Sequence, residues 1–521
     1  MTAANKREGM TLKILDQYDV VVVGESIGSL LSACLAAEKG MSVLLVGARP
    51  LKLLSVSKYG QYFDPEPNYF LGVRSPGKWA GLLGKCLERL SICAGGFDMP
   101  KASEMILQVM TPDSRVVLNH DDNDFAVEIE REFRRNLLAK SGLLDAVRCS
   151  DSGFLRYWLE LGEEARGNHS DNVMCDFTSH SKAGLGYSHG WERNLKDIWI
   201  NRGLRVSDLN KMVGSNGFSE ITTGLAFATL NRTLKDPFLG DVLHMVALDR
   251  TAAAFRGGMT ALRCYLKNLA ERVGVRVELD SRCKSIFLDD KSKLVGVQLN
   301  GYGKMIGTSR AVFGCPSDEI MAYICATDKK SNKTKSPLQL FEQPCGWRFT
   351  IALSVHDEAI PPGMTARTVW QERDGPPMEI EVANPSDYGS AEPETKILFF
   401  RTVMPFTKES LDKKTQKLFA AKMFRQATRI MPFLEFHVKQ VYPDFRSGVM
   451  TNYDDQPPYD FISLSDIPLN LRIFEKGGLG YFSGLTGIYL ASEESFPELG
   501  TLGGVVAAIE AVRKISSGPL G

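Results

Sequence analysis

A run of β-branched residues near the N-terminus leads directly into a glycine turn, and this feature constrains the fold most strongly. Tyr18–Val23 (YDVVVV) has the composition of a strand that is buried on both faces. Gly24–Ser29 (GESIGS) follows, Leu30–Lys39 places apolar and small residues at helical spacing, and Met41–Val46 (MSVLLV) is typical of a second strand. This order within about thirty residues predicts a Rossmann-like nucleotide-binding unit.

The turn after the first strand contains the residues that we expect to bind the nucleotide. Gly24 permits a tight turn, and the small side chain of Ser26 lets the backbone approach a diphosphate. Ile27, Gly28 and Ser29 open the helix, whose first N–H groups and positive dipole end face the same anion.

Two later segments have the same character. Phe255–Met259 (FRGGM) is a glycine turn before a helix, and strands are expected over 275–279, 281–287, 293–299 and 311–316. Near the C-terminus, residues 487–493 (GIYLASE) predict a buried strand that ends in the acid Glu493. Gly503 and Gly504 then open a helix of small residues.

Taken together, these segments resemble the FAD-binding flavoproteins of the glutathione-reductase type, in the branch of phytoene desaturases and flavin amine oxidases. The resemblance implies that the backbone at Cys283 contacts the adenine and that Glu493 binds the ribityl chain of FAD. It also implies that the helix beginning at Gly503 and Gly504 points at the flavin ring, where a positive helix end stabilises the reduced flavin. The nucleotide turn would hold the diphosphate.

The sequence departs from the family pattern at several positions. Ser26 and Ser29 stand where the family has glycines, and Gly47 stands where it has the acid that binds the adenosine ribose. The glycine doublet that usually follows that acid is absent. Two alternatives therefore stay open: a unit of this shape that has lost its nucleotide, and NAD(P) in place of FAD, with Arg49 facing a 2′-phosphate.

The expected fold class is α/β, with a Rossmann-like FAD-binding domain assembled from N-terminal, middle and C-terminal segments and an α+β substrate domain. The FAD-binding parts are expected over 16–75, 251–326 and 476–521, and the substrate region over 76–250 and 327–475.

The resemblance implies an FAD-dependent oxidoreductase that moves a hydride from an apolar substrate, an isoprenoid or an amine, to flavin N5. The alternative is a non-catalytic binding protein of the same fold that has lost FAD, similar to the Rab GDP-dissociation inhibitors. No catalytic residue is identified by the sequence. The charged segment over 125–138 is expected to be a solvated helix face, and peripheral contact with a membrane is left open.

Composition excludes several other classes of protein. Lys plus Arg and Asp plus Glu number 62 each, so the chain lacks the positive charge of a nucleic-acid coat protein. The ten cysteines form no CxxC pair and no zinc-ligand spacing with histidine, which argues against a metal site and for a reducing compartment. The first fifteen residues lack the apolar core of a signal peptide, and we expect a cytoplasmic protein.

Overall fold

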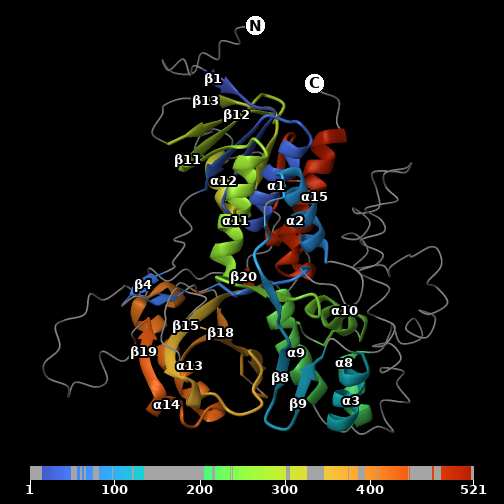
Figure 1. The fold of residues 1–521 in the computed structure, drawn as a ribbon, viewed down its shortest axis with the longest axis vertical. Coiled ribbons are helices and arrows are strands. Elements are labelled where there is room, and N and C mark those ends of the chain that lie inside the picture. Colours follow the sequence, from blue (N-terminus) through green and yellow to red (C-terminus); the bar gives the residue numbers. More distant parts are fainter. Residues whose placement is uncertain are drawn as a thin grey trace, which may run out of the picture.

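The computed structural model of the chain has two parts, each built on an eight-stranded sheet and arranged one above the other along the longest axis (Figure 1). The first and last described elements, β1 (Ile14–Gln17) and α15 (Leu502–Ser517), both belong to the upper part. The residues that the structure describes are 14–48, 56–58, 61–63, 66–73, 81–96, 98–119, 122–133, 205–213, 217–234, 236–237, 239–300, 305–325, 345–373, 375–384, 394–405, 407, 409–443, 445, 472–473 and 483–517.

The core of the upper sheet is parallel and combines distant parts of the chain. Its strands are β11 (Arg276–Leu288), β3 (Val43–Gly47), β2 (Val20–Val23), β14 (Ala311–Phe313) and β21 (Ile488–Leu490), in that order across the sheet. All four neighbouring pairs run parallel. Strands from the N-terminal, middle and C-terminal segments therefore lie side by side, which confirms the predicted fold class.

Helices cover both faces of this sheet because its central strand is apolar on both sides. Val20 and Val22 of β2 pack into one core cluster, and Val21 and Val23 pack into another. The first cluster lies under α1 (Ile27–Glu38), α11 (Gly258–Arg272) and α15 (Leu502–Ser517), and the second under α12 (Ser317–Cys325). Burial of both faces of β2 explains why its sequence is a continuous apolar run.

One prediction about the strands was wrong. The expected strands over 275–279 and 281–287 form a single strand, β11, whose pairing shifts between Glu278 and Arg282. Its first half runs parallel to β3, and its second half runs antiparallel to β12 (Leu294–Leu299), which continues the sheet to β13 (Met305–Gly307) and β1 (Ile14–Gln17). The bulge at this shift lets one continuous strand pair first with β3 and then with β12. The C-terminal strand also ends at Leu490, before the acid.

The lower sheet is mostly antiparallel and has a helix layer on each face. Its order is β19 (Val438–Tyr442), β15 (Gly346–His356), β18 (Thr395–Pro405), β17 (Met378–Ala383), β16 (Arg367–Trp370), β8 (Leu107–Met110) and β9 (Arg115–Leu118), with β20 (Arg472–Ile473) beside β15. One face packs on α9 (Gly217–Leu230) and the other on α13 (Lys413–Ile430) and α14 (Leu434–His437).

Shorter elements complete the described part of the chain. There is a small three-stranded sheet of β6 (Tyr69–Phe70), β10 (Ala253–Phe255) and β7 (Ala102–Glu104), and a separate two-stranded pair of β4 (Val56–Lys58) and β5 (Gln61–Phe63). The remaining α-helices are α2 (Leu82–Cys93), α3 (Asp122–Glu132), α8 (Val206–Val213) and α10 (Leu239–Asp249). The expected charged helix begins earlier, at Asp122, and its expected last positions, 134–138, lie outside the described residues. Within the described residues, no helix has the length and apolarity needed to cross a bilayer.

Candidate cofactor site

The first turn of α1 presents unbonded backbone donors at the end of β2. Gly24 adopts a φ of +118°, which lets the chain leave the strand sharply. Ser26 is the N-cap, and its Oγ accepts the N–H of Ser29 at 3.2 Å. Within the described residues, the N–H groups of Ile27 and Gly28 have no hydrogen-bond partner. This helix end therefore has the donors and the dipole that suit a diphosphate.

At Gly28, the N-terminal segment packs directly against the C-terminal segment. A Cβ built on Gly28 would overlap the carbonyl oxygen of Ala491, just beyond β21, and would lie 2.8 Å from the carbonyl oxygen of Gly504 in the first turn of α15. The starts of both helices therefore meet at the C-terminal ends of β2 and β21. In open α/β sheets, ligands bind at this edge.

The serine at position 29 is accommodated by a glycine from the middle segment. The Ser29 side chain is fully buried, and its hydroxyl lies 3.0 Å from that of Ser26. A Cβ on Gly314, which follows β14, would overlap both hydroxyls. The two replacements of family glycines by serine therefore depend on a third small residue, which the sequence analysis did not single out.

The absence of an acid at position 47 has a structural cause. A Cβ on Gly47 would overlap the carbonyl oxygen of Leu279, where β11 passes close to the end of β3. Arg282 occupies the same region and donates a hydrogen bond from Nη1 to the carbonyl oxygen of Ala48 at 2.9 Å. The usual ribose-binding acid therefore does not fit this backbone.

Cys283, whose backbone was predicted to contact an adenine, lies in β11 next to that bulge. It pairs with Leu299 of β12, and the preceding residue, Arg282, pairs with Gly47 at the end of β3. Its side chain is buried among apolar residues of the upper sheet. Its contact with a cofactor stays a prediction.

Glu493 begins the short 3₁₀ helix η6 (Glu493–Ser495) after β21, at the junction of the two parts, where its charge interacts with that of Arg348 in β15. Burial and the neighbouring carboxylate of Glu66 raise its pKa to about 7, against the opposing effects of Arg348, Arg263 and a hydrogen bond with Asn231. Glu493 thus stands between the start of α15 and the lower part. Gly503, in the first turn of α15, packs against the carbonyl group of Phe496.

The raised pKa predicts a pH dependence of stability. Because the folded-state pKa of Glu493 is about 7 and the ordinary value is 4.5, the folded protein retains a proton that the unfolded chain has released between these values. This contribution to stability is complete below about pH 4.5 and is lost as the pH rises to about 7. Urea unfolding of the wild type and of Glu493→Gln at both ends of this range measures it.

In Glu493→Gln, the fall in the unfolding midpoint between those pH values should be smaller than in the wild type. Glu435→Gln, which changes an exposed glutamate on α14, is the matched control and should behave as the wild type. Identical pH profiles for all three proteins would contradict the raised pKa of Glu493.

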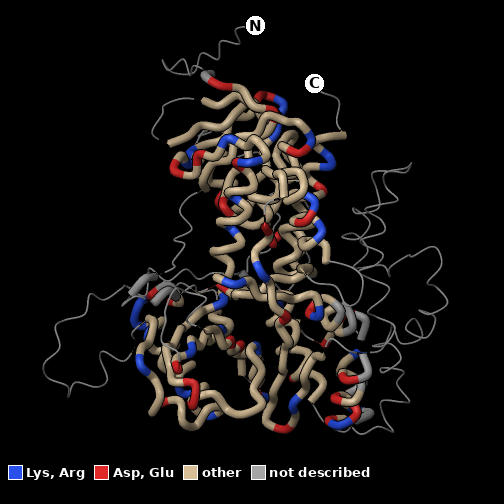
Figure 2. The backbone as a smooth tube through the Cα atoms, viewed as in Figure 1, with Lys and Arg blue, Asp and Glu red and all other residues tan. Residues whose placement is uncertain are grey.

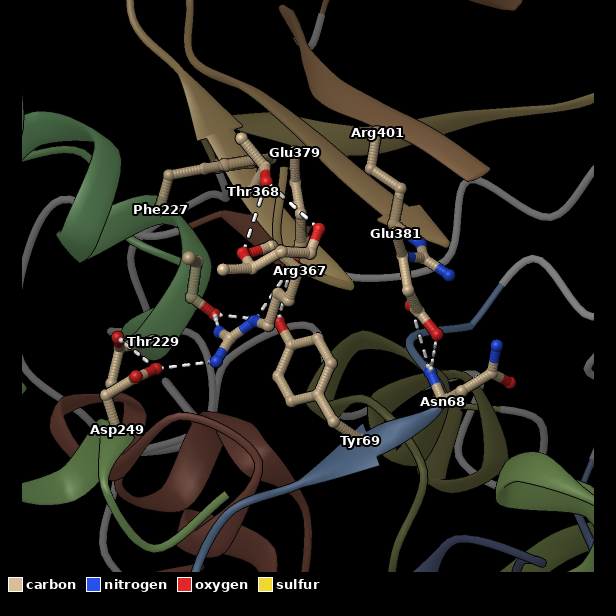
Figure 3. A network of polar contacts seen from close by, with 12 residues as sticks. Asn68, Tyr69, Phe227, Thr229, Asp249, Arg367, Thr368, Glu379, Glu381 and Arg401 are labelled. Atoms are coloured by element: carbon tan, nitrogen blue, oxygen red, sulfur yellow. Dashed lines mark hydrogen bonds and ion pairs between the residues drawn. The ribbon is translucent and has the colours of Figure 1, made fainter. Parts of the chain in front are cut away.

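Beneath the junction lies a network of buried charges (Figure 3). Its members carry three positive and three negative charges, and each is at most 1% exposed: Arg348, Arg367, Arg401, Asp249, Glu379 and Glu381. Burial opposes ionisation of Glu379, but the three arginines outweigh burial and lower its pKa. The network therefore holds ionised groups inside the protein by mutual pairing.

Arg367 is the centre of this network. Its Nη1 lies 2.5 Å from Asp249 Oδ1, and its Nε lies 3.2 Å from Glu379 Oε1. Nη2 donates to the carbonyl oxygen of Ala228 at 3.0 Å. The guanidinium also lies 3.6 Å from the centre of the Tyr69 ring, and burial raises the pKa of this tyrosine to about 12. One side chain thus joins α9, α10, β6 and the lower sheet.

The network reaches the junction at both ends. Arg401 Nη1 lies 2.6 Å from Glu381 Oε2, and Glu381 accepts the backbone N–H of Asn68 at 3.3 Å. The Asn68 side chain is 5% exposed, and its amide oxygen and nitrogen have no partner within the described residues. At the other end, the charge of Arg348 opposes part of the rise in the pKa of Glu493. Sequence analysis did not identify this network.

Comparison with known proteins finds similarity in structure alone. No protein-family model matches the sequence, and no curated protein matches it. An oxidoreductase from Methanosarcina mazei superposes with a TM-score of 0.55 at 12% identity, covering 94% of this chain and 99% of that one. The chain shares this fold. A Pyrococcus furiosus protein gives a TM-score of 0.54 at 11% identity, covering 96% of this chain and 98% of that one.

A triple mutant of putrescine oxidase, redesigned in its cofactor binding, gives a TM-score of 0.50 at 15% identity and covers 96% of this chain and 99% of that one. Each superposition therefore includes both parts of the molecule. At these identities the similarity establishes the fold and leaves the activity and the substrate open.

Proposed function

We propose that the chain is an FAD-dependent oxidoreductase that takes a hydride from an apolar substrate. The observation that carries the proposal is the meeting of the first turn of α1, the end of β21 and the start of α15 at one sheet edge, on a fold shared with oxidoreductases. FAD, when bound, supplies the redox chemistry by accepting the hydride at N5. The protein supplies binding, orientation and charge.

The residues fit most of this cofactor. The N–H groups of Ile27 and Gly28 and the hydroxyl of Ser26 would hold the diphosphate. Glu493 would bind the ribityl hydroxyls, and the positive end of α15 would stabilise negative charge on the reduced ring. Gly47 does not fit, because no acid can extend from this position to the ribose. We expect weaker retention of the adenosine half as a result.

The buried charge network would give this site a rigid floor. Its ion pairs and hydrogen bonds connect β16, β17 and β18 with one another and with β6, α9 and α10. A rigid, water-poor wall keeps a substrate in a fixed orientation, and orientation contributes strongly to catalysis. The Asn68 amide, with its polar atoms unpartnered, would be available to bind a polar group of the substrate or cofactor.

Purified protein tests the proposal directly. We expect a yellow protein with a flavin absorbance spectrum that releases FAD on denaturation. A colourless protein that also fails to bind added FAD would overturn the proposal. It would favour the alternative, a non-catalytic binding protein similar to the Rab GDP-dissociation inhibitors.

A charge substitution at the helix cap tests the diphosphate position. Asp and Asn both cap helices well and have the same shape, so Ser26→Asp and Ser26→Asn should differ only in charge. We expect Ser26→Asp to weaken FAD binding about tenfold or more relative to Ser26→Asn, because a carboxylate would face the diphosphate. Titration of the flavin-free proteins with FAD measures the difference. Equal affinities would place the diphosphate elsewhere.

A further inference from the structure

The helices α13 and α14 cover one face of the lower sheet, in the part of the molecule away from β1 and α15 (Figure 1). The inward side of α13 is apolar, and Ala420, Met423 and Ala427 are buried against the lower sheet. The outward side is different and has no role in the proposed cofactor site.

Three large apolar side chains on or next to these two helices are exposed. Phe436 is 82% exposed, Phe433 is 65% exposed and Leu418 is 63% exposed. Large apolar side chains with this much exposure are few in the described part of the chain, and two of them are phenylalanines only three residues apart. Phenylalanine at such exposure is typical of surfaces that meet an apolar phase.

The exposed side of α13 is also basic. One face of α13 has Lys414, Leu418, Lys422, Arg425 and Arg429, which follow one another at spacings of three or four residues and are all exposed. We call these five residues, with Phe433 and Phe436, the basic–aromatic face. α13 contains six Lys and Arg residues and no Asp or Glu.

Little of this positive charge is neutralised by the protein itself. Arg429 pairs with Glu372 at 3.1 Å, and α14 contains one acidic residue, Glu435. Lys414, Lys422 and Arg425 have no ion-pair partner within the described residues. By contrast, Figure 2 shows charges of both signs interspersed over the molecule, and on α3 Arg131 pairs with Glu128 at 2.7 Å. The excess on α13 is therefore local.

We propose that the basic–aromatic face docks on the surface of an anionic phospholipid membrane. Phenylalanine rings insert among the lipid chains next to the headgroups, and lysine and arginine side chains bind the phosphate and carboxylate groups of the lipids. The long basic side chains can extend their charged ends to the headgroups while the rings stay lower. This combination suits a lipid surface better than a nucleic acid, whose bases require stacking along a groove.

Vesicle flotation of the full-length protein tests the proposal. We expect the wild type to float with vesicles of phosphatidylcholine and phosphatidylserine, to remain behind with vesicles of phosphatidylcholine alone, and to dissociate as salt is raised. Phe433→Ser with Phe436→Ser, and separately Lys422→Glu with Arg425→Glu, should each reduce binding to the anionic vesicles about tenfold or more.

Matched controls alter the same residue types elsewhere. Ile92 on α2 is 71% exposed and Lys291 lies in an exposed turn, so Ile92→Ser and Lys291→Glu should bind vesicles as the wild type does. Failure of the wild type to bind anionic vesicles, equal binding by the variants, or binding that ignores lipid charge would each overturn the proposal. So would a wild-type dimer that both double variants convert to monomer, because the face would then bind a second copy. Flavin content does not enter the measurement, so this result is independent of the proposed function.

Discussion

Replacing Arg367 with methionine is expected to lower the free energy of unfolding by about 3–5 kcal/mol, the cost of breaking a buried ion pair by removing one partner. Methionine retains most of the volume but leaves Asp249 and Glu379 without the cation that lies 2.5 Å from one and 3.2 Å from the other. It also removes the guanidinium from the Tyr69 ring. The midpoint of urea unfolding measures the loss.

A second arginine of the lower part provides the control. Arg429 lies 3.1 Å from Glu372, and the two side chains are 73% and 31% exposed. Ion pairs at the surface contribute about 0–1 kcal/mol, so Arg429→Met should change the midpoint little. If the two variants unfold at the same urea concentration, the charges around Arg367 are solvated in the native protein and the network is not a buried one.

The network also shows where sequence reasoning stops. Glu379 and Glu381 alternate with apolar residues in β17, and such alternation indicates a strand with one solvated face. Here the polar face is buried instead. Glu381 pairs in register with Arg367 of β16, and Glu379 pairs with Arg401 of β18. The opposite charges are far apart in the sequence, so only the strand pairing reveals that they compensate each other.

Local patterns were sufficient for the upper sheet. The double burial of β2 and the small residues of α1 predicted these elements because their signals lie within a few neighbouring residues. The union of three segments in one sheet was predicted from resemblance to a family. The overlap of a side chain at Gly47 with Leu279 was not predicted, because it depends on a bulge in β11, more than two hundred residues away.

Replacing Gly28 with alanine is expected to destabilise the protein by about 3 kcal/mol or more, the upper end for overpacking. The added methyl group would overlap the carbonyl oxygen of Ala491, which is main chain and has no rotamer with which to move aside. Relief requires that α1 separate from β21 and α15. Because the candidate diphosphate site lies at this crossing, the variant should also lose affinity for FAD.

Replacing Gly504, on the opposite side of the same contact, should have the reverse effect on stability. A Cβ on Gly504 would lie 3.5 Å from the carbonyl oxygen of Ala491, an ordinary contact, and the residue is helical. Alanine there should be neutral or stabilising by about 0.4–1 kcal/mol, because it reduces the freedom of the unfolded chain. Urea unfolding of both variants decides the matter. Equal stability of Gly28→Ala and Gly504→Ala would mean that the first turn of α1 does not pack against Ala491 as closely as described. Cofactor binding at this shared sheet edge would then lose its support.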